Sequence, residues 1–144
     1  MWRTVDSGTP RTTQRMTLFQ YKSGKCLVLE ATVTDTFALS NIMESAMRAG
    51  AAALRAEESK RRKYSQLSST YLFEPVAYET TGVCGESTSL VFKELGSKLC
   101  DASGDTRETA WLRQRISMAI VRGNAACVRA SVSRLSGADP WIPP

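Results

Sequence analysis

Three carboxylates at the ends of β-rich segments are the residues of this chain best suited to chemistry. Glu30 lies inside an apolar run, Asp35 follows that run, and Glu79 ends a later one. A carboxylate inside an apolar strand costs burial energy unless it meets a partner or a cation. Ligands of α/β sheets bind beyond the carboxyl ends of the strands, so we expect the three groups to converge near one sheet edge. Their oxygens would suit a hard cation such as Mg²⁺.

Other catalytic chemistries are excluded by composition. The chain contains no histidine, which removes Ser-His-Asp and Cys-His catalysis and histidine-ligated zinc. The four cysteines, at positions 26, 84, 100 and 127, form no CxxC pair. Thiols so far apart indicate reduced core residues rather than a zinc site. Catalysis would therefore depend on carboxylates, lysines, hydroxyls or a bound hard cation.

Basic residues make nucleic acid the partner class to consider, because the net charge is +5 and arginine suits phosphate. Two sets stand out. The run Lys60, Arg61, Arg62 and Lys63 would end a helix, and Arg115, Arg122 and Arg129 recur every seven residues, which places them on one helix face. Such a row could follow a phosphate backbone. The alternative for both sets is an ordinary solvated helix surface.

The elements that must position these residues begin with a β-hairpin. Residues 16–21 and 26–33 are β-rich, and the turn between them contains a glycine,. A helix is expected from residue 41 to about residue 67, and a strand over residues 71–79. Because the helix connects two strands as a crossover, the sheet must contain a parallel pair. Pro75 lacks an N–H group, so the second of these strands should lie at a sheet edge or carry an irregularity.

Two more helices are expected, over residues 86–99 and from about residue 106 to 135, with a loop at 102–105 between them. Spacings of three and four predict the buried face of each helix. The residues on these faces are Met43, Ala46, Met47, Gly50, Ala51, Leu54 and Glu58 in the first helix, Leu90, Val91, Leu95 and Leu99 in the second, and Leu112, Ile116, Ala119, Ile120, Gly123 and Cys127 in the third.

The expected organisation is one α/β domain over residues 16–136. A loose or truncated lead-in occupies residues 1–15, and residues 137–144 form a proline-containing tail,. A chain of 144 residues is large enough for one hydrophobic core. No apolar run is long enough to span a bilayer, and the N-terminus lacks a signal peptide. We therefore expect an intracellular protein, in the nucleus or the cytoplasm.

Several segments of the sequence, taken together, resemble a known family. They are MTLF, GKCLVLEATVTDT, AGAAALRAEESKRRKYSQL, FEPVAYETTGVCG and QRISMAIVRGNAA, and they span roughly residues 16–128. Their order resembles the region downstream of the reverse transcriptase in LINE-type (non-LTR) retroelement proteins of animals. That region is in turn similar to a restriction-endonuclease-like PD-(D/E)XK nuclease fold. The resemblance implies a core of β-hairpin, crossover helix and parallel strand, followed by two C-terminal helices.

The resemblance also implies a catalytic set, from which this chain departs. Family members place a metal-binding aspartate where this chain has Gln14 and a second acid where it has Glu30, while Thr32 stands in the lysine position. Lys60 or Lys63 would have to reach the site from the crossover helix, and Glu79 or Asp35 would have to add oxygen ligands. One carboxylate alone is a poor cage for Mg²⁺.

Three functions remain open on this basis. The first is a degenerate nuclease-like domain without catalysis or cofactor, which binds nucleic acid, DNA rather than RNA, through its basic helices. The second is an active Mg²⁺-dependent DNA endonuclease that uses Glu30 with Glu79 or Asp35. The third is a transposon-derived fragment with no independent biochemical role.

Overall fold

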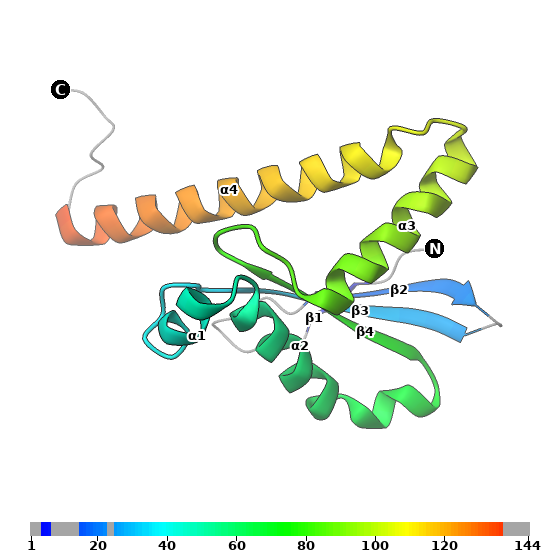
Figure 1. The fold of residues 1–144 in the computed structure, drawn as a ribbon, viewed down its shortest axis with the longest axis horizontal. Coiled ribbons are helices and arrows are strands. Elements are labelled where there is room, and N and C mark those ends of the chain that lie inside the picture. The colour runs from blue at the N-terminus through cyan, green and yellow to red at the C-terminus, as the bar shows by residue number, and fades with distance from the viewer. Residues whose placement is uncertain (1–3, 7–14, 23–24, 137–144) are drawn as a thin grey trace.

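A four-stranded sheet with helices on both faces forms the body of the chain. The computed structural model describes residues 4–6, 15–22 and 25–136. In chain order the elements are β1 (Thr4–Asp6), β2 (Arg15–Lys22), β3 (Lys25–Thr34), α1 (Ile42–Met47), α2 (Ala51–Lys63), a 3₁₀ helix η1 (Ser65–Ser69), β4 (Leu72–Glu79), α3 (Glu86–Ser103) and α4 (Glu108–Ser136). The strands lie in the order β1-β2-β3-β4, and Figure 1 shows α2 and α3 on opposite sides of them.

The two faces of the sheet are distinguished by alternate side chains of β4. Phe73 contacts Tyr64 at the end of α2, with ring centroids 5.1 Å apart. Tyr78 contacts Phe92 of α3 from the other face, at 6.1 Å between centroids. The buried apolar core follows β3, β4 and α2, with Ile120 added from α4; its members are Leu27, Val28, Ala52, Ala53, Val76, Ala77 and Ile120.

The predicted hairpin is confirmed. β2 pairs antiparallel with β3, and Met16 lies opposite Glu30 in the register. The expectation of a loose segment over residues 1–15 was incomplete, because β1 pairs antiparallel with β2. A strand therefore precedes the hairpin.

The predicted parallel pair is confirmed as well, and with it the mixed α/β class. β3 and β4 run parallel, with Leu27 opposite Leu72 at one end of the ladder and Thr34 opposite Glu79 at the other. The chain returns from β3 to β4 through α1 and α2, as a crossover connection requires.

β4 is an edge strand, as Pro75 predicted, and the outer backbone groups of its last residues, Ala77 and Glu79, are occupied. The Thr88 hydroxyl accepts a hydrogen bond from the Ala77 N–H at 2.7 Å. The Gly85 N–H donates to the Ala77 carbonyl at 3.0 Å, and the Glu79 N–H donates to the Val83 carbonyl at 2.7 Å. The segment that follows β4 therefore satisfies the outer groups of the C-terminal half of β4, which a further strand would otherwise pair with.

The single helix expected over residues 41–67 is wrong. α1 ends at Met47, and Gly50 adopts a left-handed φ of 83° immediately before α2. A Cβ added at Gly50 would lie 3.3 Å from the Val83 side chain, so little room exists there for another residue. Because the chain turns at this point, Met43 and Met47 do not follow the buried face of α2, and they are 77% and 89% exposed.

The two C-terminal helices are confirmed with different boundaries and packing. α3 continues to Ser103 through part of the expected loop, and it ends at Gly104, whose φ is 74°. A Cβ at Gly96 would overlap the Thr109 side chain, so the absence of a side chain at Gly96 lets α4 approach α3 closely. Leu90 and Leu99 of the expected buried face are 63% and 41% exposed, because Thr88 and Gly96 occupy the contact positions instead. Ala119, Gly123 and Cys127 of α4 are exposed as well.

Candidate functional site

Glu30 and Lys60 form a buried ion pair between β3 and α2. The Lys60 Nζ lies 2.6 Å from the Glu30 Oε1, and the two side chains are 17% and 0% exposed. The residues are 30 positions apart in the chain. They meet because α2 returns over the face of the sheet to which Glu30 belongs. The lysine expected to reach Glu30 from the crossover helix is therefore in contact with it.

Tyr64 and Lys63 complete what we call the Glu30 cluster: Glu30, Lys60, Lys63 and Tyr64. The Tyr64 hydroxyl donates to the Glu30 Oε1 at 3.4 Å. The Lys63 Nζ lies 4.9 Å from the centre of the Tyr64 ring, within the range of a cation–π contact. Hydrogen bonding to the Tyr64 hydroxyl raises the pKa of Lys63, and the nearby Glu30 carboxylate adds to this effect. The cluster thus places one lysine and a phenol on the carboxylate, and a second lysine over the phenol ring.

The second oxygen of Glu30 is the unexplained atom of the cluster. Oε2 is buried, and it has no hydrogen-bond partner among the described residues. A buried carboxylate is tolerated when a paired cation offsets its desolvation, and Lys60 supplies that cation through Oε1 only. One oxygen of the Glu30 carboxylate is therefore paired with a cation, and the other has no hydrogen-bond donor among the described residues.

Glu79 does not join the Glu30 cluster, contrary to the expectation that the carboxylates converge. Glu30 lies opposite Pro75 in the β3–β4 ladder, and Glu79 lies opposite Thr34. Four residues along a strand separate these rungs by about 13 Å.

Glu79 instead caps a helix. Its Oε1 accepts the Ala52 N–H at the start of α2, at 3.0 Å, and its Oε2 accepts the hydroxyls of Thr36 at 3.4 Å and Thr81 at 3.3 Å. These bonds give the carboxylate a structural role, because it supplies an acceptor to the N-terminus of a helix.

Asp35 also lies apart. It is exposed, and its Oδ1 accepts the Phe37 N–H at 3.0 Å in the turn after β3. Over the part of the chain that the structure describes, no group of three or more histidine, cysteine, aspartate or glutamate residues is arranged to hold a metal ion. Gln14, at the position of the family aspartate, lies outside the described residues, and Thr32 pairs with Ala77 in the ladder. The donor set around Glu30 therefore does not fit Mg²⁺.

Glu57 is a buried carboxylate that the sequence pattern missed. It is 1% exposed, and it caps α3 from α2. Its oxygens accept the N–H groups of Ser87 at 3.2 Å and Thr88 at 2.9 Å, and the Thr88 hydroxyl at 2.6 Å. The pattern placed Glu58 inward, yet that side chain is exposed. Glu57 lies four residues after Ala53, which has no exposed surface, but the apolar spacing of the sequence placed neither residue on the buried face.

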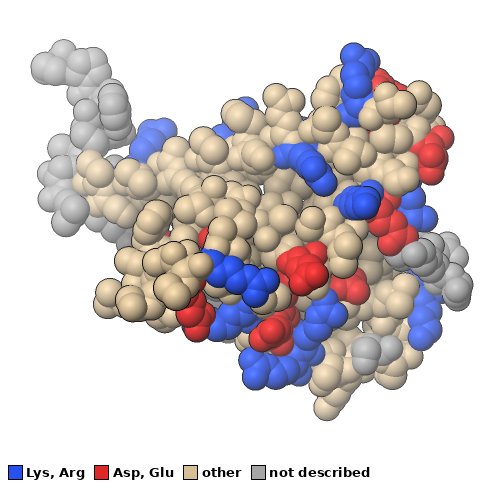
Figure 2. Space-filling view, viewed as in Figure 1, with Lys and Arg blue, Asp and Glu red and all other residues tan. Residues whose placement is uncertain are grey.

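The basic run at the end of α2 divides into two pairs. Lys60 is bonded to Glu30, and Arg61 lies 3.1 Å from the Glu74 carboxylate and also contacts the Ser87 hydroxyl. Arg62 and Lys63 are exposed. Figure 2 shows basic side chains gathered where α2 ends, with acidic side chains beside them. The run therefore contributes two exposed cations, not four, that form no ion pair with an acidic side chain among the described residues.

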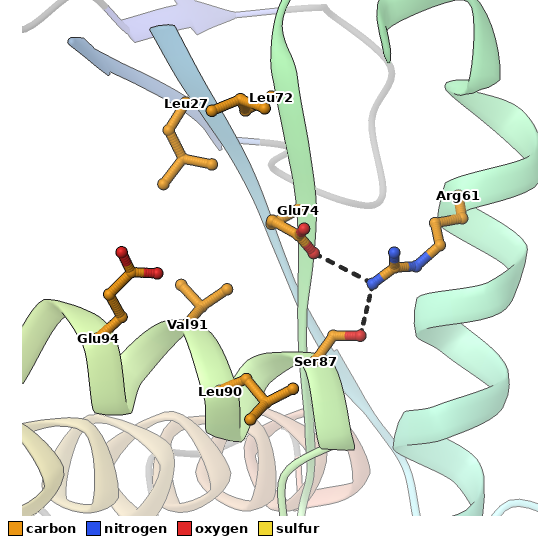
Figure 3. Close-up of a pocket in the computed structure, with 8 residues that line it drawn as sticks. All are labelled: Leu27, Arg61, Leu72, Glu74, Ser87, Leu90, Val91 and Glu94. Carbon is orange, nitrogen blue, oxygen red and sulfur yellow. Dashed lines mark hydrogen bonds and ion pairs between the residues drawn. The ribbon is translucent and has the colours of Figure 1, made fainter. Parts of the chain in front are cut away.

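A cavity of about 520 Å³ lies on the α3 side of the sheet. Figure 3 shows Arg61 bridging Glu74 and Ser87 at one side of it. Its lining residues are Leu27, Arg61, Leu72, Glu74, Ser87, Leu90, Val91 and Glu94. Leu27 and Glu30 are three residues apart on β3, so their side chains point to opposite faces. The cavity is separate from the Glu30 cluster.

The arginine row of α4 does not share a surface with the end of α2. Arg115, Arg122 and Arg129 are all exposed. α4 packs on α3, and Figure 1 shows it on the opposite side of the sheet from α2. The two basic sets identified in the sequence thus belong to different faces of the molecule.

Comparisons with protein-family models, with curated proteins and with solved structures find no match to this chain. Among the described residues, no helix has both the length and the apolar character needed to cross a bilayer. The resemblance to retroelement proteins and the intracellular location stay predictions.

Proposed function

We propose that this chain is a degenerate, retroelement-derived nuclease-like domain that binds nucleic acid without cleaving it. Two observations support the proposal. One is the sequence resemblance, and the other is that the fold contains a β-hairpin, a crossover helix and a parallel strand. A restriction-endonuclease-like core has this arrangement of elements. Glu30 lies on the second hairpin strand, and Lys60 comes from the crossover helix.

One observation carries the claim that cleavage is lost. The Glu30 carboxylate has no exposed surface and is paired with Lys60 at 2.6 Å, while Glu79 caps α2 about 13 Å further along the strands,. Two-oxygen coordination of a hard cation needs carboxylates that converge on open space. The contacts of Glu30 and Glu79 are those of structural residues.

The proposed binding of nucleic acid depends on the exposed cations at the end of α2. Arg62 and Lys63 are exposed, and the bonds of Lys60 and Arg61 to acidic side chains fix the helix turn that presents them. Exposed cations bind phosphates with little dependence on base sequence. DNA is the preferred substrate in this proposal because the family fold acts on DNA.

The binding test uses fluorescence anisotropy with a labelled 20-base-pair DNA duplex and the matching RNA duplex over a series of salt concentrations. We expect log affinity to fall linearly with log salt, and the double variant Arg62→Ala/Lys63→Ala to reduce the slope by about 2. The matched control is Arg48→Ala/Lys93→Ala, which removes two exposed cations elsewhere and should leave most of the affinity. Equal losses in both variants, or no binding at low salt, would contradict the proposal.

The second candidate function, Mg²⁺-dependent endonuclease activity, would have to use the unpartnered Oε2 of Glu30, although the described donor set does not fit Mg²⁺. The test incubates supercoiled plasmid with the chain and either Mg²⁺ or Mn²⁺, and compares the parent with Glu30→Gln. The first proposal predicts no nicking by either protein. Nicking by the parent that Glu30→Gln abolishes would establish the second function in its place.

A further inference from the structure

The C-terminal half of α4 carries an apolar stripe. Met118, Val121, Ala125 and Val128 follow one another at spacings of three and four, the a and d positions of a heptad,. Three of these side chains, Met118, Val121 and Val128, are 47%, 59% and 63% exposed. The heptad spacing is typical of a helix that packs along a second helix.

α4 packs against the rest of the molecule through the side opposite to the apolar stripe. Ile120 is 8% exposed, and the Asn124 side chain donates to the Thr80 carbonyl at 2.7 Å. From residue 125 to residue 132 every side chain is exposed. Figure 1 shows no helix or strand against the upper side of this half of α4. A helix end without packing is only marginally stable in water, so this segment gains from a partner.

The arginine row lies directly beside the stripe. At 100° per residue, Arg115, Arg122 and Arg129 occupy the e positions of the same heptad. Among the described residues these three arginines form no ion pair with an acidic side chain. Glu108, in the first turn, is the one acidic residue of α4. The exposed half of the helix is thus apolar along one line and positive along the next.

We propose that this face of α4 binds an amphipathic helix of a partner protein whose apolar seam is flanked by glutamate or aspartate. Charge decides against a second copy, because paired α4 helices would bring two positive surfaces together. Nucleic acid would match the arginines, but it would leave the apolar stripe in water. The stripe covers an arc of only about 80°, and its four residues include none of the Trp, Phe or Leu typical of helices that bind membranes. Trp111, one heptad before Met118, lies instead against the Arg107 guanidinium, which is 4.9 Å from its ring centre. A helix with acidic flanks would bury the apolar stripe and pair with the arginine row at the same time.

The test uses two synthetic 21-residue peptides, each with valine at a and leucine at d in three heptads. One carries glutamate at e and g, and the other carries lysine there; like charges at these positions keep each peptide from pairing with itself. Fluorescence anisotropy of the labelled peptides is measured with the full chain. We expect saturable binding of the glutamate peptide and at least about tenfold weaker binding of the lysine peptide.

Two pairs of variants identify the surface. Val121→Gln/Val128→Gln should weaken binding of the glutamate peptide by at least about tenfold, whereas Ala119→Gln/Ala126→Gln, at exposed positions off the stripe, should leave it unchanged. Arg122→Glu/Arg129→Glu should reverse the preference toward the lysine peptide. Circular dichroism of each variant checks that the fold is retained, and the reversal is a gain that unfolding cannot produce.

Several outcomes would overturn the proposal. The first is equal affinity for both peptides, or binding of neither. The second is a dimer in light scattering that Val121→Gln/Val128→Gln dissociates, since a second copy would then cover the stripe. Two others are binding to vesicles with anionic lipid that depends on Val121 and Val128, and binding to duplex DNA that depends on Arg122 and Arg129 but not on the stripe.

Discussion

At the residue scale, the contacts of each carboxylate explain why its charge is tolerated. Glu30 meets a lysine ammonium, while Glu57 and Glu79 meet the N–H groups of helix N-termini. All three are buried, yet the first is an ion pair and the other two are caps. Sequence reasoning identified Glu30 and Glu79 as carboxylates in need of partners. It could not distinguish an ion pair from a cap, because that choice depends on which backbone groups the fold brings close.

The ion pair of Glu30 predicts a non-additive response to mutation. Lys60→Met leaves the Glu30 carboxylate buried and uncompensated, so we expect a loss of about 3 kcal/mol in the free energy of unfolding. The double variant Glu30→Leu/Lys60→Met removes both charges and should lie within about 1 kcal/mol of the parent. Urea denaturation followed by circular dichroism measures both.

The matched control is Arg62→Met, which changes an exposed cation two positions away and should cost less than about 0.5 kcal/mol. A double variant that is as unstable as Lys60→Met would show that the pair contributes specific stability beyond charge compensation, contrary to this account.

At the element scale, the helices are connected by their caps as much as by apolar packing. Glu57 extends from α2 to the N-terminus of α3, and Glu79 extends from β4 to the N-terminus of α2. Gly85 lies against the Glu57 carboxylate so closely that a Cβ there would overlap it. The two carboxylates thus join β4 to α2 and α2 to α3.

Removal of the α3 cap should be costly. In Glu57→Ala the N–H groups of Ser87 and Thr88 lose their charged acceptor, and we expect a loss of about 3 kcal/mol in the free energy of unfolding. Glu58→Ala, the adjacent but exposed position, should change it by less than about 0.5 kcal/mol. Thermal and urea denaturation of the two variants provide the comparison, and similar values for both would refute the capping role.

The sequence predicted the order and type of the main elements because their periodicity is local. The hairpin, the edge position of β4, and the start of α4 to within about two residues follow from apolar spacing and from Pro75 and Thr106. The break between α1 and α2 was not predicted. At the break Gly50 has a left-handed φ of 83°, and a Cβ at this position would meet Val83, a residue far from it in the chain. The buried side of α3 was missed for the same reason, since Gly96 is buried by Thr109 of the next helix.

At the scale of the whole molecule, charge and apolar surface are distributed by face. The α2 face carries the Glu30 cluster and two outward cations, and α4 carries the arginine row with its apolar stripe. A net charge of +5 predicts an affinity for polyanions but does not indicate a face. The division into two surfaces follows from the fold, because the sheet lies between α2 and α4.

The global stability should fall in alkaline solution because of one tyrosine. Burial, and secondarily the nearby Cys84, raise the pKa of Tyr78 to about 12 from an ordinary value of 10.0. The unfolded chain therefore releases this proton at lower pH than the folded one, and stability declines as pH rises through that interval. Thermal midpoints measured from pH 9 to 12 should fall more steeply for the parent than for Tyr78→Phe. Parallel curves would contradict the assignment.

The hydrogen bonds on the outer edge of β4 limit where a further strand can be added to the sheet. Pro75 has no N–H to offer, and Thr88, Gly85 and Val83 engage the groups of Ala77 and Glu79. A strand from another chain therefore finds no free pairing groups at Ala77 and Glu79, in the C-terminal half of β4. Among the described strands, β1 lies at the other end of the strand order. We expect a strand added to this sheet to pair beside Thr4–Asp6 rather than against the C-terminal half of β4.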